Sequence, residues 1–198
     1  MIELDNTLLV GKGAFRECYR HPDNNGLCVK VLFRQDIYQK AIRREIEYYE
    51  RLIKRNVDFS MLSRYYSATE TNIGRAHVYE LICDSDGQVS QSLEYYLQSE
   101  ELSKKYFEII LMCLKNLKEY LIKQKILTLT LYPRNLVLQL VDEPKLVIID
   151  DIGNTEFIRF SEFISYLAIK KVNRKWGRFV EFLQINYPNN PLIDKIED

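Results

Sequence analysis

Short apolar runs separated by turn-forming residues dominate the first part of the chain, and this pattern predicts β-strands. The runs that fit strands are residues 7–10, 17–20, 27–33, 61–71 and 76–83. Between the third and fourth runs, apolar residues recur three and four positions apart, as in Ile42, Ile46 and Tyr49. That spacing is typical of a helix with one buried face, so residues 35–55 are expected to form a helix.

The second part of the chain shows helical spacing over longer stretches. Helices are expected at residues 91–97, 100–123, 157–168 and 173–186. A polar stretch, residues 84–88, lies ahead of them and suits a linker. Two apolar runs, residues 136–140 and 145–149, are joined by a short polar turn and predict a β-hairpin. The chain is therefore expected to be an α+β protein of two lobes, residues 1–83 and 84–198.

Composition narrows the class of protein. With 46% hydrophobic residues in a chain of 198, a sizeable core can be buried. Basic and acidic residues both number 28, so the overall charge gives no reason to expect nucleic acid as a partner. The four cysteines form no C-x-x-C pair, which argues against a zinc site. No apolar run approaches the roughly 20 residues of a transmembrane segment, and the N-terminus lacks a basic secretion signal, so a cytoplasmic protein is expected.

Two glycines form the first candidate site. Gly11 and Gly13 lie between two expected strands, and such a turn lets backbone N–H groups approach phosphate oxygens closely. The same spacing also serves an ordinary hairpin turn. Arg16 follows, and its charge would either attract phosphates or block their close approach.

Lys30 is the one charge inside the apolar run 27–33. An embedded lysine costs stability unless its ammonium is paired or reaches water. Glu45 lies on the same face of the expected helix as Tyr49, so it could point inward at Lys30. The alternative is a lysine on the exposed face of an edge strand. His77 has no ligand partners nearby in the sequence and is expected to be structural.

The expected hairpin carries polar groups where its two strands meet the rest of the chain. Asn135 precedes the first strand, and Asp150 and Asp151 follow the second. Pairing of the two strands would put an amide oxygen and a carboxylate side by side. These are groups that can hold magnesium on nucleotide phosphates.

The order of these parts, over about three-quarters of the chain, resembles the protein-kinase-like superfamily. More closely, it resembles the YrbL family of bacterial PhoP-regulatory-network proteins. The local matches are G-K-G-A-F-R-E-C-Y-R-H-P at 11–22, V-K-V at 29–31, R-R-E-I-E-Y-Y at 43–49, P-R-N-L at 133–136 and D-D-I-G-N at 150–154. The resemblance implies a bilobal kinase-like fold, with a five-stranded antiparallel N-lobe that holds one helix and a reduced, mainly helical C-lobe.

The resemblance also implies ATP and Mg²⁺ as cofactors. The residues that it places at the nucleotide are Gly11, Gly13, Arg16, Lys30 and Glu45. The glycines would cover the phosphates, and Lys30 would contact the α- and β-phosphates with Glu45 orienting it. Asn135 and Asp150 would hold the magnesium ion. Asp151 is the rival metal ligand, because Asp151-Ile152-Gly153 has the spacing of the kinase D-F-G motif.

The catalytic position departs from the kinase pattern. Thr128 and Thr130 stand where an active kinase has the His and Asp of its catalytic loop, and a threonine hydroxyl cannot accept a proton at neutral pH. Asp151 or Asp142 would then have to supply a base. Base catalysis contributes about 10²–10⁴-fold, whereas phosphoryl transfer depends mainly on metal and positioning, so slow transfer stays open.

Two functions of different class follow from these expectations. The first is a regulatory pseudokinase, linked to a PhoP-type two-component network, that binds ATP with magnesium between its lobes and engages a protein partner. The second is an atypical phosphotransferase for a small molecule, glycan or lipid headgroup. An interaction domain with an empty cleft is a third possibility. Both nucleotide hypotheses require Lys30 and Asp150 to face the same cleft.

Overall fold

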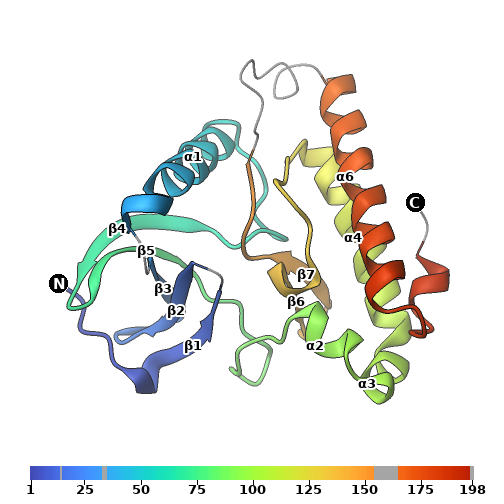
Figure 1. The fold of residues 1–198 in the computed structure, drawn as a ribbon, viewed down its shortest axis with the longest axis horizontal. Coiled ribbons are helices and arrows are strands. Elements are labelled where there is room, and N and C mark those ends of the chain that lie inside the picture. The colour runs from blue at the N-terminus through green and yellow to red at the C-terminus, as the bar shows by residue number, and fades with distance from the viewer. Residues whose placement is uncertain (14, 33–34, 154–164, 197–198) are drawn as a thin grey trace.

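The computed structural model describes residues 1–13, 15–32, 35–153 and 165–196 (Figure 1). A twisted β-sheet with one helix across it forms one side of the molecule, and two long helices form the other. A short hairpin lies between them. This arrangement confirms the expected α+β class with a five-stranded antiparallel sheet and one helix in the N-terminal lobe.

The sheet contains five strands in the order β1-β2-β3-β5-β4, and each neighbouring pair is antiparallel. The strands are β1 (Leu9–Lys12), β2 (Arg16–His21), β3 (Asn24–Leu32), β4 (Tyr65–Thr71) and β5 (Gly74–Glu80). Helix α1 (Gln35–Lys54) connects β3 to β4 and buries Ile42, Tyr48, Tyr49 and Leu52. This order places β3 at the centre of the sheet, so Lys30 stands on a central strand and not on an edge.

Two segments of the sheet lobe differ from the sequence-based expectation. The loop expected around residues 21–26 is a tight hairpin, because β2 and β3 pair until only Pro22 and Asp23 remain between them. The strand expected from residue 61 begins at Tyr65. Residues 61–63 pair with the hairpin instead: the Ser63 N–H donates to the Ile148 carbonyl at 2.9 Å. The chain thereby joins the two lobes by backbone hydrogen bonds.

Helices dominate the second half of the chain. They are α2 (Leu93–Leu97), α3 (Glu100–Lys105), α4 (Phe107–Gln124) and α6 (Ser165–Asn186). The single helix expected at 100–123 is divided at Tyr106, where the backbone leaves the helical region. The helix expected at 157–168 lies outside the described residues up to position 164, and its last four residues belong to α6. Helix α6 continues without a break because Ala168, Val172 and Trp176 keep a buried helical stripe.

The hairpin consists of β6 (Leu136–Gln139) and β7 (Lys145–Ile148), and β7 packs against α4. Helix α6 packs on α4 as well. One hydrophobic cluster runs through both lobes, since it contains Tyr49 and Leu52 of α1 together with Leu117 and Trp176 of the helical side. The expected lobes therefore share a core.

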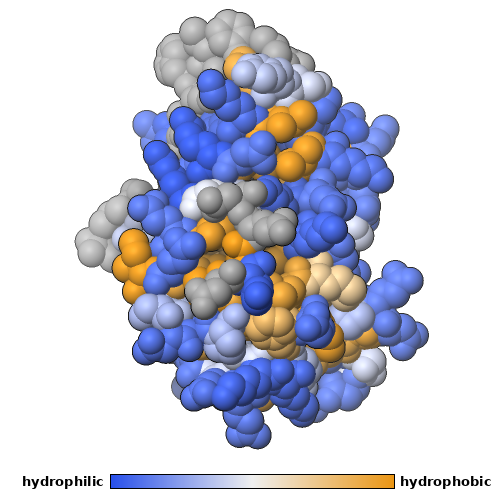
Figure 2. Space-filling view, turned by 90° about the vertical axis from the view of Figure 1, so that its right-hand side faces the viewer, coloured by the Kyte–Doolittle hydropathy of each residue, from blue (hydrophilic) through white to orange (hydrophobic). Residues whose placement is uncertain are grey.

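The helical side of the molecule is mostly hydrophilic, with orange apolar patches set among blue side chains (Figure 2). Over the described part of the chain, the helices fall short of the length and apolar character that crossing a membrane requires.

Candidate functional site

A cavity of about 840 Å³ lies between the sheet and the hairpin. The sequence-predicted residues that line it are Gly11, Gly13, Arg16, Lys30, Asn135, Asp150 and Asp151. Lys30 and Asp150, 120 positions apart, thus face one cleft, which was the geometric requirement of the nucleotide hypotheses. Glu45 lies just behind this lining and reaches the cleft through Arg16.

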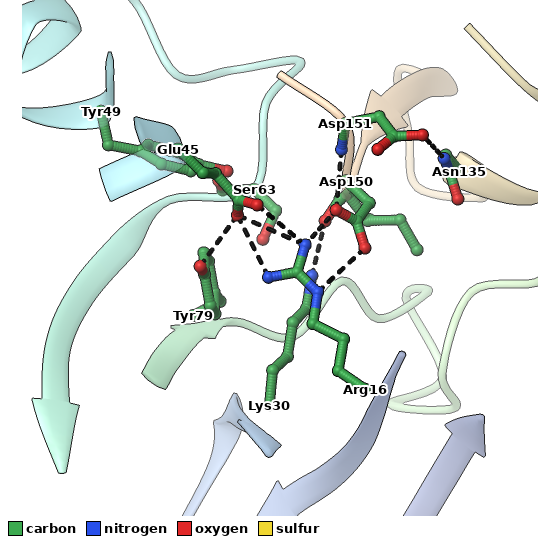
Figure 3. Close-up of polar contacts among 10 residues, drawn as sticks. Arg16, Lys30, Glu45, Tyr49, Ser63, Tyr79, Asn135, Asp150 and Asp151 are labelled. Atoms are coloured by element: carbon green, nitrogen blue, oxygen red, sulfur yellow. Dashed lines mark hydrogen bonds and ion pairs between the residues drawn. The ribbon is translucent and has the colours of Figure 1, made fainter. Parts of the chain in front are cut away.

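Arg16 is the centre of the site (Figure 3). It is the first residue of β2, its side chain is only 5% exposed, and its guanidinium points between the two lobes. Nη2 donates to Glu45 Oε2 at 3.0 Å and also to Asp150 Oδ1, while Nε donates to Asp150 Oδ2 at 3.2 Å. One cation therefore joins a carboxylate of the sheet lobe to a carboxylate of the hairpin. The two carboxylates hold the pKa of Arg16 well above its usual value against the opposing effect of burial.

Glu45 reaches this cation because of its position on α1. Ile42 and Tyr49, three residues before and four after it, are buried, so the same face carries the Glu45 carboxylate into the protein. The carboxylate also accepts a hydrogen bond from the Tyr79 hydroxyl at 2.9 Å. Within the described chain, the cation at salt-bridge distance from Glu45 is Arg16, which differs from the Lys30–Glu45 pair that the kinase resemblance implies.

Lys30 spans the cleft in a different way. Its Nζ donates to the Ile149 carbonyl oxygen at 2.6 Å, and the ammonium lies 4.6 Å from the centre of the Tyr79 ring. The ring face and the carbonyl together stabilise a cation whose residue is only 7% exposed. Lys30 is therefore held toward the hairpin, close to the two aspartates that follow Ile149.

Asp150 is engaged on both of its oxygens. Each oxygen accepts from Arg16, and Oδ1 also accepts the Asp151 backbone N–H at 2.7 Å. Burial raises the pKa of the Asp150 carboxyl, but Arg16 and Lys30 outweigh burial and hold that pKa below its usual value. Asp150 is thus an ionised carboxylate whose negative charge is already matched.

Asp151 has the opposite environment. Its Oδ2 accepts from Asn135 Nδ2 at 2.8 Å, so the amide expected to pair with Asp150 pairs with Asp151. Its backbone has φ +60°, a conformation that L-residues rarely adopt. Burial, with a further contribution from the Asp150 charge, raises the pKa of the Asp151 carboxyl to about 6. The Leu129 N–H donates to the Asp151 carbonyl at 2.7 Å and helps to hold this backbone in place.

The glycine turn forms the outer wall of the cleft. The Gly13 N–H donates to the Arg16 carbonyl at 2.8 Å and closes the turn between β1 and β2. A Cβ at Gly11 would meet no atom within 4 Å, so the space over this residue is open. The turn therefore leaves room for a ligand beside Arg16.

The threonines at the catalytic-loop positions and the alternative base Asp142 differ in their position relative to the cleft. Thr128 is buried and bridges to Ile152, and Thr130 is not among the described residues that line the cleft. Asp142 lies in the exposed turn at the far end of the hairpin, beyond the four residues of β6. Asp142 is not among the described residues that line the cleft, and its role as a base stays a prediction.

Sequence analysis missed several groups that complete the site. Tyr79 binds Glu45 and covers Lys30, and the thiols of Cys18 and Cys28 line the cleft. The Cys28 thiol donates to the Glu80 carbonyl oxygen at 3.7 Å. The proximity of the two thiols lowers the pKa of Cys18 and raises the pKa of Cys28. One signal was present in the sequence: Cys28 and Lys30 alternate along one strand, so they share a face of the sheet.

A metal ion would find ligands on only one side of the cleft. Asn135 and Asp151 offer an amide and a carboxylate, a set that suits Mg²⁺ when phosphates supply further oxygens. Asp150 does not fit this role while both of its oxygens accept from Arg16. Among the residues with a described position, no group of three or more His, Cys, Asp or Glu could hold a metal by itself.

The sequence matches the family model for the PhoP regulatory network protein YrbL over residues 2–184. The YrbL proteins of Escherichia coli strain K12 and of Shigella flexneri are each 33% identical to the chain over 183 residues. These alignments cover 91% of this chain and 87% of each relative. Among solved structures, a kinase domain is similar at a TM-score of 0.47 and 20% identity, over 66% of this chain and 38% of that one.

Proposed function

The chain belongs to the YrbL family of PhoP regulatory network proteins, and we propose that it is a regulatory pseudokinase that binds ATP in the cleft between sheet and hairpin. The observation that carries this proposal is the meeting of the glycine turn, Lys30 and the two aspartates on one cavity. The volume of about 840 Å³ lies in the range of small-molecule sites.

The chain's own groups suit a triphosphate. The open space over Gly11 lets phosphates approach the backbone of the turn. Lys30 presents an ammonium beside the hairpin, and Arg16 presents a guanidinium next to the turn. Magnesium would add positive charge between the phosphates, and Asn135 and Asp151 are the residues that would hold it.

A regulatory role is favoured over protein phosphorylation because the position of the catalytic base holds Thr130. Binding needs only groups that position and neutralise phosphates, and these are present. In this proposal the nucleotide stabilises one relative placement of the lobes. A protein partner in the PhoP network then recognises that nucleotide-bound arrangement.

Isothermal titration calorimetry of the full chain with ATP and Mg²⁺ tests the proposal. We expect saturable binding that is weakened about tenfold or more in Lys30→Met, because the ammonium that faces the phosphates is lost. Lys104→Met is the matched control, since Lys104 is an exposed lysine of α3 outside the cleft lining, and it should bind like the wild type. Absence of binding by the wild type would exclude the proposal.

One observation favours the second candidate, an atypical phosphotransferase for a small molecule, glycan or lipid headgroup. Asp151 has a pKa of about 6, which suits a general base near neutral pH. Transfer of label from γ-³²P-ATP should then occur in the wild type and vanish in Asp151→Asn, while loss in Asp150→Ala would indicate that the Arg16 pairing is needed too. If none of the three proteins transferred label although ATP still bound, the phosphotransferase would be excluded and the pseudokinase would remain.

A further inference from the structure

We propose that Arg16 takes the place of a divalent metal at Asp150, so that this cleft binds a nucleoside triphosphate without needing Mg²⁺. The inference rests on the proposed function and adds the residue that determines its cation requirement. It starts from the two aspartates, because kinases of the usual kind employ a strand-end aspartate to hold metal on the phosphates.

The first step is the occupancy of both oxygens of Asp150. Its two oxygens accept Nε and Nη2 of the same guanidinium, which is the paired geometry that makes arginine–carboxylate contacts strong. The Asp151 N–H takes a further position on Oδ1. Three of the roughly four lone-pair positions of the carboxylate are thereby taken. A metal ion bound to Asp150 would have to stand beside the Arg16 guanidinium in a largely buried site, where two cations repel each other strongly.

The second step is the permanence of the Arg16 charge. A guanidinium does not lose its proton in proteins, and this one is bound to two carboxylates and 5% exposed. It is therefore a fixed positive charge at the junction of the lobes, supplied by the chain itself. A magnesium ion would supply charge at the same junction only when present in solution.

The third step is the donor that Arg16 keeps. A guanidinium has five N–H groups, and Glu45 and Asp150 accept from Nε, Nη1 and Nη2. One hydrogen of Nη1 is left over after these contacts are made. Arg16 lines the cavity next to the open glycine turn, so its guanidinium lies beside the space that the phosphates would occupy. Lys12, Arg20 and Arg134 also line the cavity and add positive charge along its walls.

Calorimetric titration of the full chain with ATP, once with Mg²⁺ and once with EDTA, tests the inference. We expect the two dissociation constants of the wild type to agree within about threefold. Weakening of about tenfold or more in EDTA would overturn the inference and leave the proposed function intact. Failure to bind under either condition would overturn both.

The variants extend the test. In Arg16→Met the affinity in EDTA should fall about tenfold more than the affinity with Mg²⁺, since the metal then has to supply the missing charge. In Arg20→Met, which removes another cleft arginine of the same strand, both affinities should fall by the same factor. Should Arg16→Met fail to fold, Arg16→Lys keeps a charge and loses the fork, and it should show the same trend more weakly. An unchanged ratio in a folded Arg16 variant would contradict the inference.

Discussion

The two sides of the cleft treat neighbouring aspartates in opposite ways. On the Arg16 side, Asp150 is ionised and accepts two hydrogen bonds from one guanidinium, and the pKa of its carboxyl lies below the usual value. On the Asn135 side, Asp151 has a neutral amide as its partner, a positive φ and a pKa of about 6. The side chains belong to one dipeptide, so most of the difference in their chemistry comes from residues far away in the sequence. One side of the cleft joins the two lobes through matched charges, and the other carries a carboxylate whose printed hydrogen-bond partner is a neutral amide.

The Arg16 side should show the largest effect on stability. Arg16→Met leaves two carboxylates without their cation, and we expect the free energy of unfolding to fall by about 3–5 kcal/mol in urea titrations. Lys12→Met is the control, because Lys12 pairs with Glu17 on the surface and its loss should change the midpoint little. Equal urea midpoints for the wild type and Arg16→Met would contradict the importance of this contact.

Asparagine substitutions at the two aspartates should act in opposite directions. Asp150→Asn removes one partner of Arg16 while Glu45 remains, and it should cost about 2 kcal/mol at pH 7. Asp151→Asn removes a carboxylate whose ionisation burial opposes, and asparagine tolerates the positive φ, so a gain of about 1 kcal/mol is expected. Thermal unfolding of both variants in one buffer measures the comparison. If both substitutions changed the stability in the same direction, the opposite environments of the two aspartates would be contradicted.

The pH dependence of stability should separate Asp151 from His77. Burial, together with the charges of Arg75 and Arg16, lowers the pKa of His77 from 6.5 to about 4. Its unfolded form therefore binds more protons between pH 6.5 and 4, so its contribution to stability is lost as the pH falls through that window. Asp151 acts in the reverse sense, because its folded form binds more protons below about pH 6.

When the pH is lowered from 7 to 5, the free energy of unfolding of His77→Gln should fall by about 1 kcal/mol less than that of the wild type. That of Asp151→Asn should fall by more than that of the wild type. Urea titrations at the two pH values give both differences. His77 suits this test because it is largely buried and its Nδ1 has no hydrogen-bond partner among the described residues. Identical slopes for all three proteins would mean that neither group titrates as described.

Local patterns predicted the elements well because strands and helices depend on periodic burial within short windows. The run around Lys30 became the central strand β3, and the spacing of Ile42 and Tyr49 marked the inner face of α1. The convergence of Lys30 and Asp150 was also expected, from the order of motifs. Local signals failed where strand pairing extended into a turn-rich segment: the hairpin at Pro22 closed more tightly than its composition suggested, because β2 and β3 pair up to His21 and Asn24.

The partners inside the cleft were not predictable from spacing. Arg16 lies 29 positions from Glu45 and 134 from Asp150, and nothing local to any of the three residues specifies those contacts. The choice of Asn135 between the two aspartates depends on the backbone turn at Asp151, which an Asp-Asp-Ile-Gly sequence permits but does not determine. Metal binding by Asn135 with either aspartate stays a prediction.

The backbone bonds between residues 61–63 and β7 have a consequence for dividing the gene. The polar stretch 84–88 looks like a natural place to cut, yet a fragment ending there would expose the N–H and carbonyl groups that now bind Ile148. The complementary fragment would present a bare strand edge, which tends to aggregate. Fragments of the chain that are divided at this linker, as in a split-protein reporter, should therefore be insoluble unless both fragments are expressed together.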